Sequence, residues 1–173
     1  MKGTVITCLR EVVIGAAGES TWQACLAAAG FEPYTVFHLA EDVPDHKTLA
    51  LIQAVCTKLG LTLEQAGDAF GEHWVNAYAP RLYKQLYGRY PDARSFFTNI
   101  NEMHGRVTKH IADAKPPRFR LEWTSPTTLV MHYESHRGLI DVAAGMARAM
   151  GRFYGETLHV TKLSPKALRI VFA

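Results

Sequence analysis

The first half of the chain has hydrophobic residues at helical spacing, separated by residues that begin or end helices. Gly60 directly follows one such stretch and is a typical helix stop. Ser20 with Gln23, and Thr62 with Gln65, have the spacing of a capping box, in which two side chains bind free backbone groups at the start of a helix. The helices predicted in this half cover residues 4–16, 20–29, 45–59 and 62–78.

The second half changes from helical spacing to alternation. One further helix is predicted from Ser95 toward the Pro116–Pro117 pair, which ends it. Beyond the prolines, apolar and polar residues alternate in two pairs of short segments, as in β-hairpins, with a helical stretch between the pairs. The predicted strands cover 119–123, 128–134, 158–163 and 168–172, and the helix between them covers 138–154. The predicted fold class is α+β, with a helical N-terminal half packed on a C-terminal half that holds a four-stranded antiparallel sheet and helices.

Composition narrows the class of protein. The 173 residues are 48% hydrophobic, enough for one domain or for two small subdomains that share a core. Lys and Arg are spread along the chain, and a net charge of +3 argues against a nucleic-acid-binding surface. No apolar stretch approaches the roughly 20 residues of a membrane helix. The cysteines Cys8, Cys25 and Cys56 form no paired motif, so we expect a cytoplasmic protein without disulfides or membrane insertion.

His104 continues a hydrophobic helical stripe. Phe97, Ile100, Val107 and Ile111 recur at helical spacing, and residue 104 takes the missing place among them, so its ring is predicted to face the interior. One interpretation is a core histidine that is hydrogen-bonded to a backbone carbonyl. The other is an axial ligand of haem iron, a common role of a neutral imidazole.

A run of polar side chains follows 29 residues later. Tyr133, Ser135 and Arg137 alternate in the sequence YESHR, and residues two apart share a face in an extended segment. A guanidinium and two hydroxyls together suit a carboxylated ligand. The polar face of a half-exposed strand would give the same pattern. Haem needs both a ligand for its iron and contacts for two propionates, so His104 and this run together favour haem.

These motifs belong to a sequence that resembles a known family nearly end to end. The chain is similar to bacterial H-NOX proteins, the haem-nitric oxide/oxygen binding domains also found in soluble guanylate cyclase. The segments that carry the resemblance are MKGTV at the start, FGEHWV at 70–75, NEMHGRVTKHI, KPPRF and YESHR.

The resemblance implies a cofactor and the residues that hold it. The cofactor would be haem b (iron protoporphyrin IX), with His104 as the proximal iron ligand. Tyr133, Ser135 and Arg137 match the residues that bind the propionates, and Pro117 matches a proline that presses on the haem and distorts it. The resemblance also implies a helical subdomain over 1–62 and a second subdomain over 63–173, with the haem between them. Some relatives carry a zinc site of C-terminal cysteines, which is not expected here.

A second set of residues would surround the bound gas. Family members that bind O₂ have a tyrosine where this chain has Val142, and bound O₂ needs a hydrogen-bond donor. The valine therefore favours NO and CO, although the Trp74 indole and the Tyr78 hydroxyl are possible donors if they do more than pack. The distal pocket implied by the resemblance consists of Val5, Leu9, Trp74, Tyr78, Val142 and Met146.

The expected function is a haem-based gas sensor that is not itself an enzyme. It would bind NO or CO at ferrous haem and signal by a conformational change to a separate protein. The resemblance suggests a histidine kinase or a cyclic-di-GMP enzyme as that partner. Two alternatives stay open: an O₂ sensor that uses Tyr78 or Trp74 as its distal donor, and a haem enzyme such as a peroxidase or NO dioxygenase.

Overall fold

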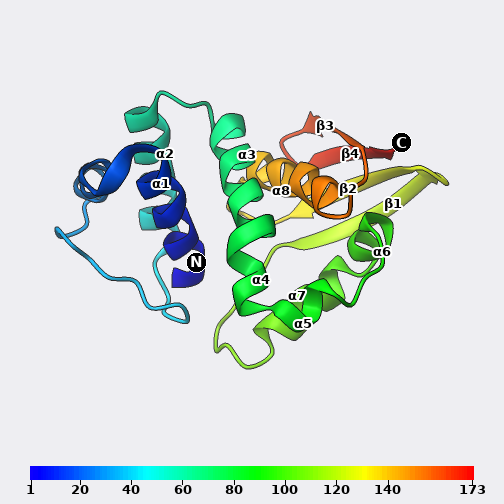
Figure 1. The fold of residues 1–173 in the computed structure, drawn as a ribbon, viewed down its shortest axis with the longest axis horizontal. Coiled ribbons are helices and arrows are strands. Elements are labelled where there is room, and N and C mark those ends of the chain that lie inside the picture. Colours follow the sequence, from blue (N-terminus) through cyan, green and yellow to red (C-terminus); the bar gives the residue numbers. More distant parts are fainter. The chain divides into compact units, whose positions relative to one another are not determined.

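The computed structural model describes the backbone of residues 1–173 and every side chain apart from that of Tyr87. The chain divides into two compact units, Met1–Ala66 and Gly67–Ala173. The first unit is helical, and the second contains the sheet (Figure 1). The predicted α+β class, with a helical N-terminal part and a four-stranded antiparallel sheet, is confirmed.

The first unit is built on two helices, α1 (Gly3–Ala28) and α2 (Asp45–Leu59). The break expected between the first two predicted helices is a kink within α1, where Gly18 takes φ 82° and ψ 169°. The predicted capping box at Ser20 is wrong, because the Gln23 amide instead donates to the Glu19 carboxylate at 2.7 Å. The helix stop at the end of α2 is confirmed: Gly60 adopts the left-handed conformation, which glycine takes without a steric penalty.

The helix predicted to reach residue 78 changes its winding on the way. A capping box opens α3 (Leu63–His73) as expected, with the Thr62 and Gln65 side chains each accepting from the other residue's backbone N–H at 3.2 and 2.9 Å. From Trp74 to Tyr78 the chain continues as a π-helix, η1. The short helices α4 (Ala79–Leu82) and α5 (Lys84–Tyr87) follow.

The helix that carries His104 is shorter than predicted. Asp92 caps α6 (Ala93–Thr98), accepting from the Ser95 backbone N–H at 2.6 Å. A break at Asn99 separates α6 from α7 (Ile100–Thr108). The Asn99 amide donates to the Ser95 carbonyl at 2.8 Å, one of the local bonds by which asparagine competes with helix continuation. Because α7 ends at Thr108, the expected extension through residue 111 is wrong.

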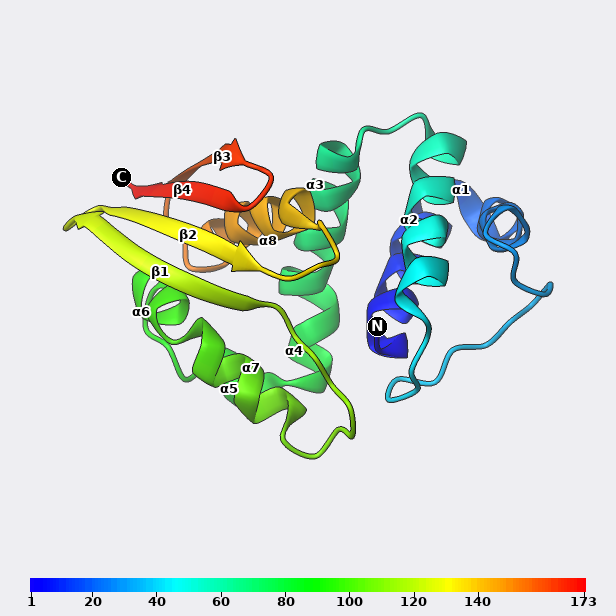
Figure 2. The same ribbon diagram turned by 180° about the vertical axis from the view of Figure 1, so that it is seen from behind.

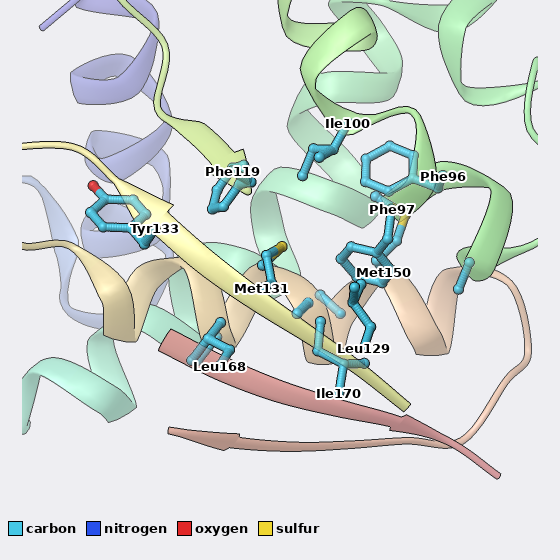
Figure 3. Packing of buried hydrophobic residues seen from close by; sticks show 14 of the residues in the cluster. Phe96, Phe97, Ile100, Phe119, Leu129, Met131, Tyr133, Met150, Leu168 and Ile170 are labelled. Atoms are coloured by element: carbon cyan, nitrogen blue, oxygen red, sulfur yellow. The ribbon is translucent and has the colours of Figure 1, made fainter. Parts of the chain in front are cut away.

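The sheet of the second unit has the strand order β1-β2-β4-β3, antiparallel throughout. Helix α8 (Ile140–Phe153) connects the two hairpins, and the helices lie against one face of the sheet (Figure 2). Alternate residues of β2, namely Leu129, Met131 and Tyr133, point into the core beneath that face (Figure 3). The strands are β1 (Arg118–Ser125), β2 (Thr128–Glu134), β3 (Leu158–Ser164) and β4 (Ala167–Phe172), close to the predicted ranges.

Three glycines let α3 and α8 cross at very short range. A Cβ added at Gly71 would lie 2.5 Å from the Gly145 carbonyl carbon, and one added at Gly145 would overlap the Gly67 carbonyl group. Charged side chains pair across the same crossing: Arg148 donates to Asp68 at 2.7 Å, and Arg152 donates to Glu72 at 2.8 Å. The backbone of α8 near Val142 and Met146 is thereby held against α3.

Candidate functional site

His104 projects from α7 and is fixed by a single hydrogen bond. Its Nδ1 lies 3.0 Å from the Pro117 carbonyl oxygen, which can only accept, so Nδ1 carries the proton. Burial lowers the pKa of His104 below its ordinary value; the hydrogen bond to Pro117 opposes this, and the nearby Arg118 charge adds to it. The ring is therefore neutral, with the Nε2 lone pair available to a metal. A metal-binding histidine usually makes such a second bond to orient its ring.

Arg137 binds the same segment. Its Nη1 donates to the Lys115 carbonyl at 2.7 Å, two residues before the carbonyl that holds His104. His104 from α7 and Arg137 from the turn after β2 thus both hydrogen-bond to the backbone of the segment 115–117. His104, the predicted iron ligand, and Arg137, a predicted propionate-binding residue, therefore both bond to the short stretch that contains Pro117.

Only the first two residues of YESHR have the extended conformation predicted for the motif. Tyr133 lies within β2, but the strand ends at Glu134, and Arg137 lies in the following turn. Ser135 therefore follows the strand rather than extending it, and its Oγ accepts from the Arg137 backbone N–H at 3.4 Å. The three side chains do not share one strand face, because the strand ends at Glu134.

Aromatic rings connect His104 to Tyr133. The Phe119 ring centroid lies 6.0 Å from that of His104 and 5.8 Å from that of Tyr133. The Tyr133 side chain is only 5% exposed, and its hydroxyl points away from the other labelled core residues (Figure 3). The donor set near this row of rings is an imidazole nitrogen, hydroxyls and a guanidinium. This set fits an iron porphyrin with carboxylate groups.

Trp74 and Tyr78 lie at the two ends of the π-helix. Their ring centroids are 5.5 Å apart, and Trp74 also stacks on Phe70 at 5.6 Å. Tyr78 is 3% exposed, and the Arg81 guanidinium lies 5.3 Å from its ring centroid. Both residues therefore make substantial packing contacts. A π-helical turn is rare and frequently occurs at functional sites, a signal that hydrophobic spacing did not contain.

The remaining predicted distal residues lie on two helices. Val142 and Met146 are one turn apart on α8, and both are partly buried. Val5 and Leu9 are likewise one turn apart, on α1 of the first unit. All the other predicted site residues belong to the second unit.

Asn101, also in the second unit, is a structural contributor that the sequence interpretation missed. It lies one turn before His104, and its side-chain amide makes two hydrogen bonds to the backbone of Phe119. An amide three residues before the histidine was the signal available in the sequence. Its partner, however, is a backbone group 18 residues away.

No group of three or more His, Cys, Asp and Glu side chains in the described part of the chain is placed to hold a metal ion. A porphyrin brings four nitrogen ligands of its own, so one histidine is enough for it. Among the described helices, none has the length and apolar character needed to cross a membrane.

Comparisons of sequence point to one family. The haem-NO-binding family model matches residues 2–162. The chain is 24% identical over 170 residues to soluble guanylate cyclase gcy-35 of Caenorhabditis elegans, and 26% identical over 156 residues to gcy-32 of the same organism. These matches cover 96% and 88% of this chain but only 25% and 23% of the two cyclases. The chain thus spans about a quarter of the length of these curated relatives.

Comparisons of structure agree on the fold. A mutant H-NOX protein from S. oneidensis in the Fe(II) ligation state has a TM-score of 0.90 at 19% identity, covering 100% of this chain and 96% of that one. An oxygen-binding H-NOX domain related to soluble guanylate cyclases has a TM-score of 0.81 at 22% identity, covering 99% and 95%. Because the family model matches residues 2–162 of 173, the chain belongs to the haem-NO-binding (H-NOX) family of haem-binding gas-sensor domains related to soluble guanylate cyclase.

Proposed function

We propose that this chain binds haem b, senses NO with CO as a second ligand, and passes the signal to a separate protein. The observation that supports this best is the state of His104: a neutral ring with Nδ1 bonded to Pro117 and the Nε2 lone pair available. A histidine that served the core alone would need the same bond to Pro117. It would not need a guanidinium, which suits a carboxylate, bonded to the same segment.

Each residue has a role that follows from its chemistry. Ferrous haem, when bound, would supply an iron able to bind a histidine and a diatomic gas. His104 would be that histidine. Arg137, Tyr133 and Ser135 would bind the propionates, and Pro117 would place a rigid ring against the porphyrin. The Arg137 guanidinium has more than one donor, so it can keep its bond to Lys115 and still bind a carboxylate.

Removing the propionate ligands should lower haem occupancy without changing the iron ligand. We expect Arg137→Ala or Tyr133→Phe to weaken haem retention, because each removes a hydrogen bond to a charged group worth about 1.5–3 kcal/mol. The measurement is the rate of haem transfer to an excess of apomyoglobin, with the ferrous absorption spectrum as the check on ligation. Arg169→Ala, at an exposed position on β4, is the matched control. Transfer rates equal to wild type in both variants and in the triple Tyr133/Ser135/Arg137 variant would contradict these roles.

The proposed preference for NO rests on the lack of donors among the aliphatic distal residues. Bound O₂ carries partial negative charge and depends on a donor, whereas NO depends mainly on the iron. Val142 and Met146 on α8 offer no donor, and neither do Val5 and Leu9 on α1. Trp74 and Tyr78 do carry donors, but their rings are engaged in packing with Phe70 and Arg81.

A panel of gases tests this preference. We expect the reduced protein to form stable complexes with NO and CO but no lasting complex with O₂ in air, as followed by absorption spectra. Val142→Tyr should extend the lifetime of an O₂ complex if the new hydroxyl reaches the ligand. A long-lived O₂ complex in the wild-type protein would overturn the preference.

The second candidate function is an O₂ sensor, and the π-helix favours it specifically. The Trp74 and Tyr78 ring centroids lie 5.5 Å apart within that turn, so the two donor-bearing side chains lie together. Loss of an O₂ complex in Tyr78→Phe or in Trp74→Phe would identify the donor. If the wild-type protein forms no such complex, this candidate is eliminated.

The proposed output is a change of shape that another protein reads. A histidine kinase or a cyclic-di-GMP enzyme is the partner we propose, on the basis of the family resemblance. The relatives named above are soluble guanylate cyclases, and this chain matches about a quarter of their length. Binding of the NO-loaded and NO-free forms to a candidate partner should differ, because a signal requires the partner to prefer one state.

A further inference from the structure

Asn101 holds helix α7 to strand β1 through both backbone groups of one residue. Its Nδ2 donates to the Phe119 carbonyl at 2.7 Å, and its Oδ1 accepts from the Phe119 N–H at 3.0 Å. In an antiparallel ladder a residue directs its N–H and C=O either both toward the paired strand or both away from it. Those of Phe119 are directed away from β2, toward the open edge of the sheet. The Asn101 amide thus takes the place of a missing neighbouring strand.

A second bond lies next to the first. His104, one turn further along α7, binds the Pro117 carbonyl, two residues before Phe119. Helix α7 is therefore fastened to the segment 117–119 at two points. Two hydrogen-bonded positions one turn apart restrict the rotation and the sliding of a helix more than either position does alone. One of these points is the proposed iron ligand itself, so Asn101 is the attachment that does not depend on the iron.

We propose that Asn101 is a positioning residue for His104. It holds α7 in register with Pro117 and thereby sets how firmly the imidazole is held against the iron and how easily NO displaces it. This inference rests on the proposed function, because it takes His104 as the iron ligand. Without Asn101, α7 keeps the apolar contacts of Ile100 and Met103 but loses the hydrogen bonds that set its position along β1, and the ring follows the helix. The histidine–iron bond then weakens, and NO displaces the histidine in a larger share of molecules.

Two substitutions at position 101 separate the two hydrogen bonds. Asn101→Leu has a similar size and removes both bonds, whereas Asn101→Asp keeps the acceptor for the Phe119 N–H and loses the donor to its carbonyl. Glu102→Gln is the matched control, because it changes an exposed side chain on α7 that pairs with Arg106. In haem-free protein, exchange of the Phe119 amide hydrogen should accelerate about five- to tenfold in Asn101→Leu and less in Asn101→Asp.

The haem-loaded protein gives the second readout. Resonance Raman spectra of the ferrous form should show the iron–histidine stretch at lower frequency in Asn101→Leu and unchanged in Glu102→Gln. The share of molecules in which NO displaces the histidine should rise in the same order. If Asn101→Leu does not fold, the same two readouts in Asn101→Asp decide the matter. Wild-type spectra in whichever variant folds would overturn the proposal and leave Asn101 with a role in folding alone.

A double variant distinguishes positioning from a general change of the pocket. In His104→Gly supplied with imidazole, the iron ligand has no covalent connection to α7. Adding Asn101→Leu to that background should leave the iron–imidazole stretch unchanged, and a shift there as large as in the single variant would also overturn the proposal. Failure of the wild-type protein to bind haem would instead refute the proposed function. The amide-exchange result would still report on the Asn101–Phe119 bonds.

Discussion

His104→Gly is expected to remove the bond between the protein and the haem iron while keeping the fold. The side chain is partly buried on α7 and contributes one hydrogen bond, to Pro117, so its loss leaves a cavity of imidazole size beside an otherwise intact core. Imidazole added during expression should occupy that cavity and restore haem retention. The measurement is the ferrous absorption and resonance Raman spectrum with and without imidazole.

His110→Gly is the control for this experiment. His110 is an exposed residue just past the end of α7, so its loss should leave haem ligation unchanged. If His104→Gly without imidazole kept the wild-type iron–histidine stretch, the assignment of His104 would be wrong. The same result would remove the basis of the proposed positioning role of Asn101.

Gly145→Ala is expected to destabilise the protein strongly. The added Cβ would overlap the Gly67 carbonyl, a backbone group that cannot move aside as a side chain can. Overpacking of this kind costs about 3 kcal/mol, which lowers the unfolding temperature by roughly 6–12 °C for a protein of this size. The measurement is thermal unfolding of the haem-free protein, followed by circular dichroism.

A second glycine provides the comparison. Gly105 lies on α7, where its Cβ would meet no atom within 4 Å apart from its chain neighbours and the backbone of its own helix, and it has no positive φ. Gly105→Ala should therefore raise the unfolding temperature slightly, because alanine favours the helix by about 0.5–1 kcal/mol. Equal unfolding temperatures for the Ala variants at 105 and 145 would show that α3 and α8 do not cross as closely as described.

The sequence predicted the strands better than the helix ends, for physical reasons. Each strand buries one face against the helices, so alternation marks β2 from Thr128 to Glu134 directly. The break at Asn99 leaves no mark in the hydrophobic spacing, because it involves a side-chain bond to the Ser95 carbonyl. The strand order β1-β2-β4-β3 depends on long-range pairing, which no local pattern contains.

In the candidate site, too, the sequence predicted individual residues but not the long-range contacts between them. The hydrophobic stripe placed His104 on an inward-facing side of a helix, and Pro117 was singled out by family resemblance. Their hydrogen bond joins residues 13 apart across a loop and could not be read from spacing. The role of Asn101 depends on which backbone groups of β1 stay unpaired in the sheet, and this is decided only when the strands assemble.

The π-helix between Trp74 and Tyr78 has a consequence for comparing this chain with its relatives. Such a turn contains one residue more than an α-helical turn, so it acts as an insertion of a single residue within a continuous helix. A relative without this turn would have one residue fewer here, and the faces of the helix before and after the turn would correspond with different offsets. An alignment that matches the two chains at Gly71 and one that matches them at Pro80 then differ by one position between these residues. The residue of the relative that is paired with Tyr78 depends on which of the two alignments is used.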